Sequence, residues 1–293
     1  MMRRSQASRA KPKVSLSFLS RCRNSRETPL KHKPKLGQNF LVDPAACVAI
    51  ADALGNVSAQ TVVEIGPGRG AITEILARRV KRLVAIELDR ELAPRLRTQF
   101  AETPSVEIIE ADVLTVDLAS LREGEEKLAV VGNLPYYITS DILLRLFEFH
   151  DVISRAVVMI QREVADRVAA SPGTRDYGLL SATAQLYARL ERVLTLPPEA
   201  FLPPPEVHST VLRLTMRPRF AEFGVDPEPF IEFLKAGFAQ KRKTLAKNLR
   251  AAGYDSARLA AALPAAAISP LARAEEIELE RMAALWKNLS QEN

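Results

Sequence analysis

Five short runs of apolar, mostly β-branched residues recur along the first half of the chain, and each is followed by glycines, by helical spacing or by both. Runs of this length are typical of buried strands. Strands that alternate with helices predict a mostly parallel sheet with both faces covered. We therefore expect a doubly wound α/β fold. The predicted strands are Thr61–Ile65, Arg82–Glu87, Val106–Asp112, Leu128–Asn133 and Ala156–Gln161.

The segments between these strands carry helical patterns. The second of them contains Pro94, which we expect inside the first turns of its helix, where proline is better tolerated than in the middle. The predicted helices are AITEILARRV (71–80), LDRELAPRLRTQF (88–100), SDILLRLFEF (140–149) and REVADRVAA (162–170).

The composition changes after the last of these helices. Residues 196–214 are dense in proline and then alternate like a strand, and beyond Pro218 the chain reads as helical and alanine-rich, with a break at Pro264. We place a domain boundary near residues 218–226. The prediction is an α/β domain over residues 31–220 and a small all-helical domain over residues 221–293.

The positive charge is concentrated at the N-terminus. Residues 1–35 hold eleven Lys and Arg against one acid, a surplus of ten, so the rest of the chain is negative by four against the total of +6. A second cluster, Gly237–Arg250, has five cations and no acid. Both clusters favour an anionic partner such as nucleic acid. Residues 1–30 fit a basic extension that is a transit peptide, an RNA-binding arm or a disordered leader, and the sequence leaves these open.

Several classes of protein are disfavoured by what the chain lacks. No run approaches the roughly 18 apolar residues of a membrane span. The two cysteines, Cys22 and Cys47, have no metal-ligand spacing and no nearby histidine, so neither a disulfide framework nor a metal site is expected. We predict a soluble protein of a reducing compartment, in the cytoplasm, with no membrane or metal partner.

Two polar features mark the ends of the first two predicted strands. EIGPGRG contains Gly66, Gly68 and Gly70, which allow a tight turn and a close approach to a ligand. Glu87 ends the next strand, 21 positions after Gly66, where a carboxylate can accept hydrogen bonds from both hydroxyls of a ribose. Dinucleotide-binding and methyl-donor-binding domains share this spacing.

The third and fourth strands end in groups that separate those two classes. Asp112 could accept a hydrogen bond from the amine of a bound adenine. The fourth strand runs into VVGNLPYY, where the Asn133 side-chain oxygen and a carbonyl of Leu134 or Pro135 could accept both N–H bonds of a planar amine, while Tyr136 offers a ring for stacking. Such a loop suits methylation of an exocyclic amine by positioning, without a strong general base.

Seven motifs in order resemble the ribosomal RNA adenine N6-dimethyltransferases, over about residues 31–250. They are QNFL, EIGPGRG, IELD, EADVL, GNLPYYIT, QREVADR and AFLPPPEVHSTVLRL. The resemblance implies a Rossmann-like class I methyltransferase that uses S-adenosylmethionine. It also implies N6,N6-dimethylation of two adjacent adenines in the 3′-terminal hairpin of 16S rRNA, in small-subunit biogenesis, by a monomer.

The same resemblance implies roles for individual residues. The expected contacts to the methyl donor are Asn39, Leu41, Gly66, Glu87, Asp112 and Asn133. The residues expected to hold the target adenine are Asn133, Leu134, Pro135, Tyr136 and Phe201, the last as an aromatic over the far face of the base.

Other readings stay open beside this one. The large-subunit (23S) dimethyltransferases that confer macrolide resistance share QNFL and the Asn-x-Pro-Tyr loop, but Leu134, the triple proline 203–205 and GFAQKRKTLAKNL resemble the small-subunit group. A mitochondrial relative remains possible because of the basic leader. A non-catalytic rRNA-binding assembly factor is a different class.

The second basic cluster is the expected contact to RNA. We predict that Lys241, Arg242, Lys243 and Lys247 lie on a helical surface and bind rRNA phosphates, against the alternative of a solvated helix face.

Overall fold

The computed structural model describes residues 38–290, and the predicted basic extension over residues 1–30 lies outside them. Nine strands are formed in this part of the chain. They are β1 Phe40–Leu41, β2 Thr61–Ile65, β3 Arg82–Glu87, β4 Val106–Glu110, β5 Leu128–Asn133, β6 Ile153–Gln161, β7 Ala188–Leu196, β8 Phe201–Leu202 and β9 Ser209–Met216.

The helices lie between and after these strands. The α-helices are α1 Pro44–Ala53, α2 Ala71–Leu76, α3 Leu92–Gln99, α4 Thr139–Glu148, α5 Arg162–Val168, α6 Leu179–Tyr187, α7 Phe220–Phe223, α8 Pro227–Phe238, α9 Leu245–Ala251, α10 Ser256–Ala265 and α11 Leu279–Ser290. Short 3-10 turns include Tyr136–Ile138, which leads into α4, and Pro198–Ala200. Pro94 lies in the first turn of α3, as predicted.

Seven strands form one sheet, in the order β4-β3-β2-β5-β6-β9-β7. The pairs β4·β3, β3·β2, β2·β5 and β5·β6 are parallel, which confirms the mostly parallel sheet. The strand order reverses between β2 and β5, and the loops after these strands leave the sheet at its carboxyl edge. This switch point is where doubly wound sheets bind ligands.

Helices cover both faces of the sheet, as expected from the continuous apolar strands. Side chains of α1 and α2 pack with Val62, Leu83 and Val131 on one face. Side chains of α4 and α6 pack with Val63, Val84 and Val130 on the other. The side chains of alternate residues in each strand thus project to opposite faces of the sheet.

The antiparallel end of the sheet was only partly predicted. β9 falls in the alternating segment, but α6 and β7 were not anticipated. β9 lies between β6 and β7 and is antiparallel to both. Four of the nine residues of β7 are polar and most of the strand is partly or fully exposed, as expected at a sheet edge, so this strand lacks the continuous apolar run of the central strands.

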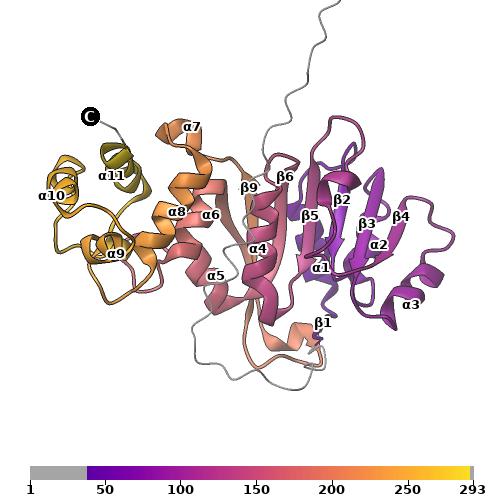
Figure 1. Ribbon diagram of the computed structural model, residues 1–293. Coiled ribbons are helices and arrows are strands. Elements are labelled where there is room, and N and C mark those ends of the chain that lie inside the picture. The colour runs from indigo at the N-terminus through magenta and orange to yellow at the C-terminus, as the bar shows by residue number, and fades with distance from the viewer. Residues whose placement is uncertain (1–37, 291–293) are drawn as a thin grey trace, which may run out of the picture.

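The C-terminal helices gather beside β9, at the end of the molecule opposite α3 and β4 (Figure 1). Phe230 packs against Trp286 and Phe233 against Tyr254. α10 ends one residue after Pro264, which agrees with the predicted break. α7 packs its Phe220 on Tyr187 of the α/β part, and the partition into two domains stays a prediction.

Two very short strands make a separate ribbon. β1 and β8 pair antiparallel, with Phe40 opposite Leu202 and Leu41 opposite Phe201. In Figure 1 the 3-10 turn that precedes β8 lies next to β1 at the lower edge of the molecule. The ribbon therefore joins the segment before α1 to the proline-rich loop, 160 residues away in the chain.

Candidate functional site

One cavity lies at the carboxyl edge of β2, β3, β4 and β5, as the predicted loops required. Of the ten residues predicted to bind the methyl donor or the adenine, all but Phe201 line it. The lining predicted residues are Asn39, Leu41, Gly66, Glu87, Asp112, Asn133, Leu134, Pro135 and Tyr136.

The glycine-rich loop after β2 forms one wall of the cavity. Gly66 and Gly68 have φ of +66° and +60°, a conformation that side chains rarely adopt. A Cβ on Gly68 would lie 3.0 Å from Cδ1 of Phe40. Glycine here thus lets the chain turn and lets the Phe40 ring lie against the loop.

Glu87, at the end of β3, is buried and accepts two backbone hydrogen bonds. The Gly68 N–H donates to one carboxylate oxygen at 3.0 Å, and the Asp89 N–H donates to the other at 2.9 Å. Burial raises the pKa of Glu87, and these hydrogen bonds oppose the rise. Each oxygen keeps a lone pair for a further donor, which is what a ribose diol requires.

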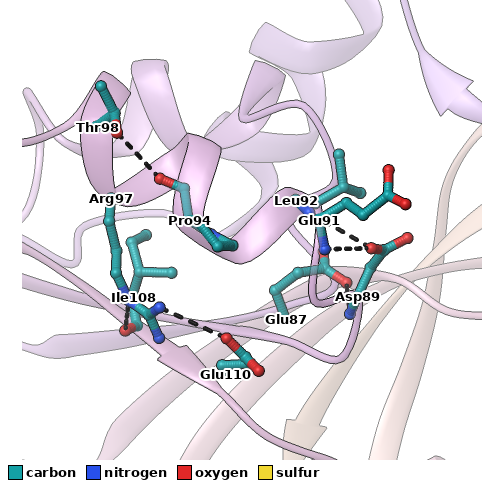
Figure 2. A network of polar contacts seen from close by, with 9 residues as sticks. All are labelled: Glu87, Asp89, Glu91, Leu92, Pro94, Arg97, Thr98, Ile108 and Glu110. Atoms are coloured by element: carbon teal, nitrogen blue, oxygen red, sulfur yellow. Dashed lines mark hydrogen bonds and ion pairs between the residues drawn. The ribbon is translucent and has the colours of Figure 1, made fainter.

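The turn after Glu87 is fixed by a second carboxylate (Figure 2). Asp89 accepts a hydrogen bond from the Glu91 N–H at 2.8 Å, at the start of α3. Arg97 of the same helix lies 3.5 Å from Glu110 of β4. These contacts attach α3 to both neighbouring strands and so hold Glu87 in place.

Asp112 follows β4 and faces the cavity. Its Oδ1 accepts a hydrogen bond from the Leu114 N–H at 2.9 Å, which forms a local turn. The pKa of Tyr137, across the cavity, is raised by burial and further by the negative charge of Asp112. Asp112 and Tyr137 both line the cavity, so the loops after β4 and β5 face the same space.

Asn133 ends β5 and is held by its amide nitrogen. Its Nδ2 donates to the backbone carbonyl of Asn39 at 3.1 Å. The side-chain oxygen is then directed away from that bond and remains an acceptor. Asn39, which was predicted to contact the methyl donor, thus also orients Asn133 through its backbone carbonyl.

The structure distinguishes the two backbone carbonyls, of Leu134 and of Pro135, that were predicted as alternative second acceptors for the amine. The Pro135 carbonyl already accepts hydrogen bonds from the Ile138 N–H at 3.2 Å and from the Thr139 hydroxyl at 3.0 Å. The Leu134 N–H donates to the Met159 carbonyl, which ties the loop to β6. Within residues 38–290 no hydrogen bond to the Leu134 carbonyl is seen, so Leu134 is the better acceptor.

Tyr136 is fixed at its hydroxyl end. Its oxygen lies 3.1 Å from the hydroxyl of Ser209, the first residue of β9. The ring is half-buried on the cavity wall. A phenol held at one end offers a ring face in a constant position.

Phe201 is buried below the cavity. It is 3% exposed and packs in the core that contains Leu41 and Met159. The structure does not bring it to the cavity wall. Its neighbour Leu202, on the other face of the ribbon, is half-exposed. Stacking of Phe201 on a base requires a movement of this loop, and that role stays a prediction.

Glu64 is a cavity residue that the sequence reasoning did not single out. It is 2% exposed and accepts a hydrogen bond from the Thr73 hydroxyl at 2.7 Å. Burial raises its pKa to about 7, the Thr73 bond opposes this, and the charge of Glu87 adds to it. The signal was present, since a lone acid inside an apolar strand is unusual.

The segment before α1 lines the cavity, and roles were predicted from the sequence only for its residues Asn39 and Leu41. Gln38 donates to Asp89 at 3.1 Å, and Arg69 lies over the Phe40 ring at 4.5 Å. Together with the Asn39 carbonyl, these contacts join residues 38–40 to three of the loops that build the site.

The predicted RNA-binding cations lie far from this cavity, and their local structure differs from the prediction. Lys241, Arg242 and Lys243 occupy the turn between α8 and α9, and only Lys247 is on a helix. The helix cannot run through because Thr244 begins a new one, accepting the Lys247 N–H with its hydroxyl. All four are exposed.

Residues 38–290 contain neither a candidate membrane span nor a candidate metal site. None of the helices there is long and apolar enough to cross a membrane. No group of three or more His, Cys, Asp or Glu is placed to hold a metal ion.

Comparison with known proteins agrees with this geometry. The family described as Ribosomal RNA adenine dimethylase matches residues 30–291. The ribosomal RNA small subunit methyltransferase A of Acidobacterium capsulatum is 66% identical over 88% of this chain and 92% of its own, and that of Koribacter versatilis is 55% identical over 88% and 94%.

Two solved structures share the fold. A dimethyladenosine transferase from Plasmodium falciparum has a TM-score of 0.73 at 21% identity, covering 84% of this chain and 95% of its own. The 23S rRNA methyltransferase ErmE has a TM-score of 0.67 at 28% identity, covering 86% and 100%. The chain is a methyltransferase with a class I fold, and it belongs to the ribosomal RNA adenine dimethylase family.

Proposed function

We propose that this protein uses S-adenosylmethionine to dimethylate N6 of two adjacent adenines in the 3′-terminal hairpin of 16S rRNA, during assembly of the small ribosomal subunit. The relatives at 66% and 55% identity carry the small-subunit name. A monomer acting in the cytoplasm is part of the proposal.

The observation that carries the proposal is the pair of acceptors after β5. The Asn133 amide is anchored through Nδ2 to Asn39, which leaves its oxygen as an acceptor, and the Leu134 carbonyl is the other. An exocyclic amine has two N–H bonds in one plane and needs two acceptors. A carboxyl or hydroxyl substrate would not use such a pair.

The residues of the cavity fit the methyl donor. The buried Glu87 carboxylate suits a ribose diol, Asp112 suits the amine of an adenine, and the glycine loop at Gly66 leaves room for the methionine part. When bound, S-adenosylmethionine supplies a methyl group on a positively charged sulfur. The nearby carboxylates favour that positive charge.

The chain's own residues then act by positioning. Asn133 and Leu134 would fix the amine in the orientation for in-line attack, and the Tyr136 ring, held by Ser209, would stack on the base. The lone pair of the adenine amine is delocalised, so orientation gains more than a base would. After the first methylation the adenine amine keeps only one N–H bond, so one of the two acceptors has no partner during the second transfer.

The RNA is proposed to extend from this cavity toward the C-terminal helices. Lys241, Arg242, Lys243 and Lys247 are exposed cations that would contact phosphates. The helical segment after residue 220 would then be an RNA-binding domain.

A direct test is methyl transfer from labelled S-adenosylmethionine to unmethylated small subunits, with large subunits and DNA as parallel substrates. Mass spectrometry of the nucleosides should find dimethyladenosine in the small-subunit RNA alone. Label in the large subunit would support the 23S alternative instead. RNA binding without label anywhere would support a non-catalytic assembly factor.

A further inference from the structure

Several exposed apolar side chains lie on, or next to, the segments that build the cavity. Among the described residues, eight large hydrophobic side chains are exposed, and five of them belong to segments that border the site. These five are Val42, Leu88, Tyr137, Leu202 and Val207. Such clustering marks an interaction surface, whereas single exposed apolar residues need no explanation.

The ribbon of β1 and β8 explains why Leu202 is one of them. Residues directly opposite in an antiparallel pair project to the same face. Leu41 and Phe201 therefore share the buried face, and Phe40 and Leu202 share the other. Phe40 lines the cavity, so Leu202, which is 52% exposed, stands beside the cavity mouth.

The loop that follows contains Val207 and ends at the cavity wall. It runs from Leu202 to Ser209, whose hydroxyl contacts Tyr136 on the cavity wall. Val207 is 41% exposed. Residues 201–209 contain no Lys or Arg and one acid, Glu206. This surface is therefore unsuited to phosphates and suited to the apolar faces of unpaired bases.

We propose that Leu202 and Val207 form an apolar lip that packs against the unpaired base next to the adenine being methylated. Because the RNA chain is continuous, the nucleotide next to the target adenine must lie at the cavity mouth when the target base is inside the cavity. The lip rests on the proposed function and adds a second base subsite to it. With two adjacent target adenines, one of them occupies the lip while the other is modified.

The first test compares the double variant Leu202→Ala/Val207→Ala with the wild type on unmethylated small subunits. We expect KM for the subunits to rise about tenfold, as for loss of one stacked base, with kcat within about twofold. Val193→Ala, an exposed apolar residue of the edge strand β7, is the matched control and should change neither. An unchanged KM in the double variant would overturn the lip.

The second test shows whether the lip holds a base. The probes are a synthetic RNA hairpin with two adjacent loop adenines and the same hairpin with one adenine made abasic, and binding is followed by fluorescence anisotropy. The wild type should lose about tenfold in affinity on the abasic hairpin, and the double variant less than twofold. Equal losses would mean that the lip touches something else, such as a ribosomal protein.

Two measurements keep the result interpretable. The midpoint of thermal unfolding and the Kd for S-adenosylmethionine of the double variant should match those of the wild type, which would show that the ribbon is intact. If either value differs, the single variant Leu202→Ala replaces the double variant. The hairpin comparison does not require methyl transfer. A wild type that binds but methylates nothing would therefore refute the proposed function without refuting the lip.

Discussion

At the scale of single residues, Asn133 has the most specific predicted role. Asn133→Ala removes an acceptor for the amine, and we expect methyl transfer to fall by roughly 10²–10³-fold, the size seen when one precisely placed polar contact to a reacting group is lost. RNA affinity should change by less than about threefold. Initial rates with labelled donor and a filter-binding titration give the two numbers. Equal losses in both would mean that Asn133 organises the loop rather than the reaction.

Glu64 should make stability depend on pH. Its pKa is raised from 4.5 to about 7 in the folded protein. Below pH 4.5 the Glu64 carboxyl is protonated in both the folded and the unfolded state. Above that pH the unfolded chain ionises first, so the free energy of unfolding falls until about pH 7, by on the order of 3 kcal/mol. In Glu64→Gln this fall is absent, so urea denaturation should show the variant gaining on the wild type between pH 5 and pH 8.

The exposed Glu102 provides the control for that comparison, since Glu102→Gln alters a solvated carboxylate. Its stability should follow the wild-type curve. Parallel curves for Glu64→Gln and the wild type would show that Glu64 is ionised in the folded protein throughout this range.

Site residues could be predicted from the sequence where they belong to a local motif. The loops at Gly66, Glu87, Asp112 and Asn133 follow directly from strands that the apolar runs located. Phe201 was harder, because its burial depends on which face of a two-residue ribbon it occupies. No local pattern encodes that.

At the scale of elements, β2 and β5 pair directly beside the cavity, with Ile65 opposite Gly132. A Cβ on Gly132 would lie 2.7 Å from the Ile65 carbonyl oxygen, a main-chain atom that cannot turn aside. Gly132→Ala should therefore push the two strands apart beside the cavity. We expect a loss of about 2–4 kcal/mol in the free energy of unfolding and weaker binding of S-adenosylmethionine.

Gly178→Ala is the matched control for this substitution. A Cβ there would meet nothing within 4 Å, and its φ of −164° is open to any residue. Urea denaturation and calorimetric titration of both variants give the comparison. Identical midpoints would mean that the sheet absorbs the methyl group without cost.

The central strands were predictable because burial on both faces leaves an unbroken apolar run. The bounds of β2, β3 and β5 agree with the prediction to the residue. β7 was missed because an edge strand exposes polar residues, and β1 and β8 because two residues are too few for any period. Their pairing is a property of the folded chain.

At the scale of the whole molecule, the cation cluster between α8 and α9 should govern how salt affects RNA binding. Neutralising Lys241, Arg242 and Lys247 together should lower the slope of log affinity against log salt by roughly two to three, if each contacts one phosphate. Gln substitutions at three exposed cations of the α/β part, Arg78, Lys81 and Arg95, form the control. An unaltered slope in the first variant would reject the phosphate contacts.

The ribbon of β1 and β8 has a consequence for the order in which the protein matures on the ribosome. The segment that completes the cavity, residues 38–41, cannot pair until Phe201 and Leu202 have been synthesised. At about 5–20 residues per second, those roughly 160 residues take on the order of 10–30 s. During that interval the glycine loop and the acids after β3 and β4 exist in a nascent chain in which residues 40–41 have no strand partner. The methyl-donor cavity thus acquires the strand pair at its edge only late in the protein's own translation.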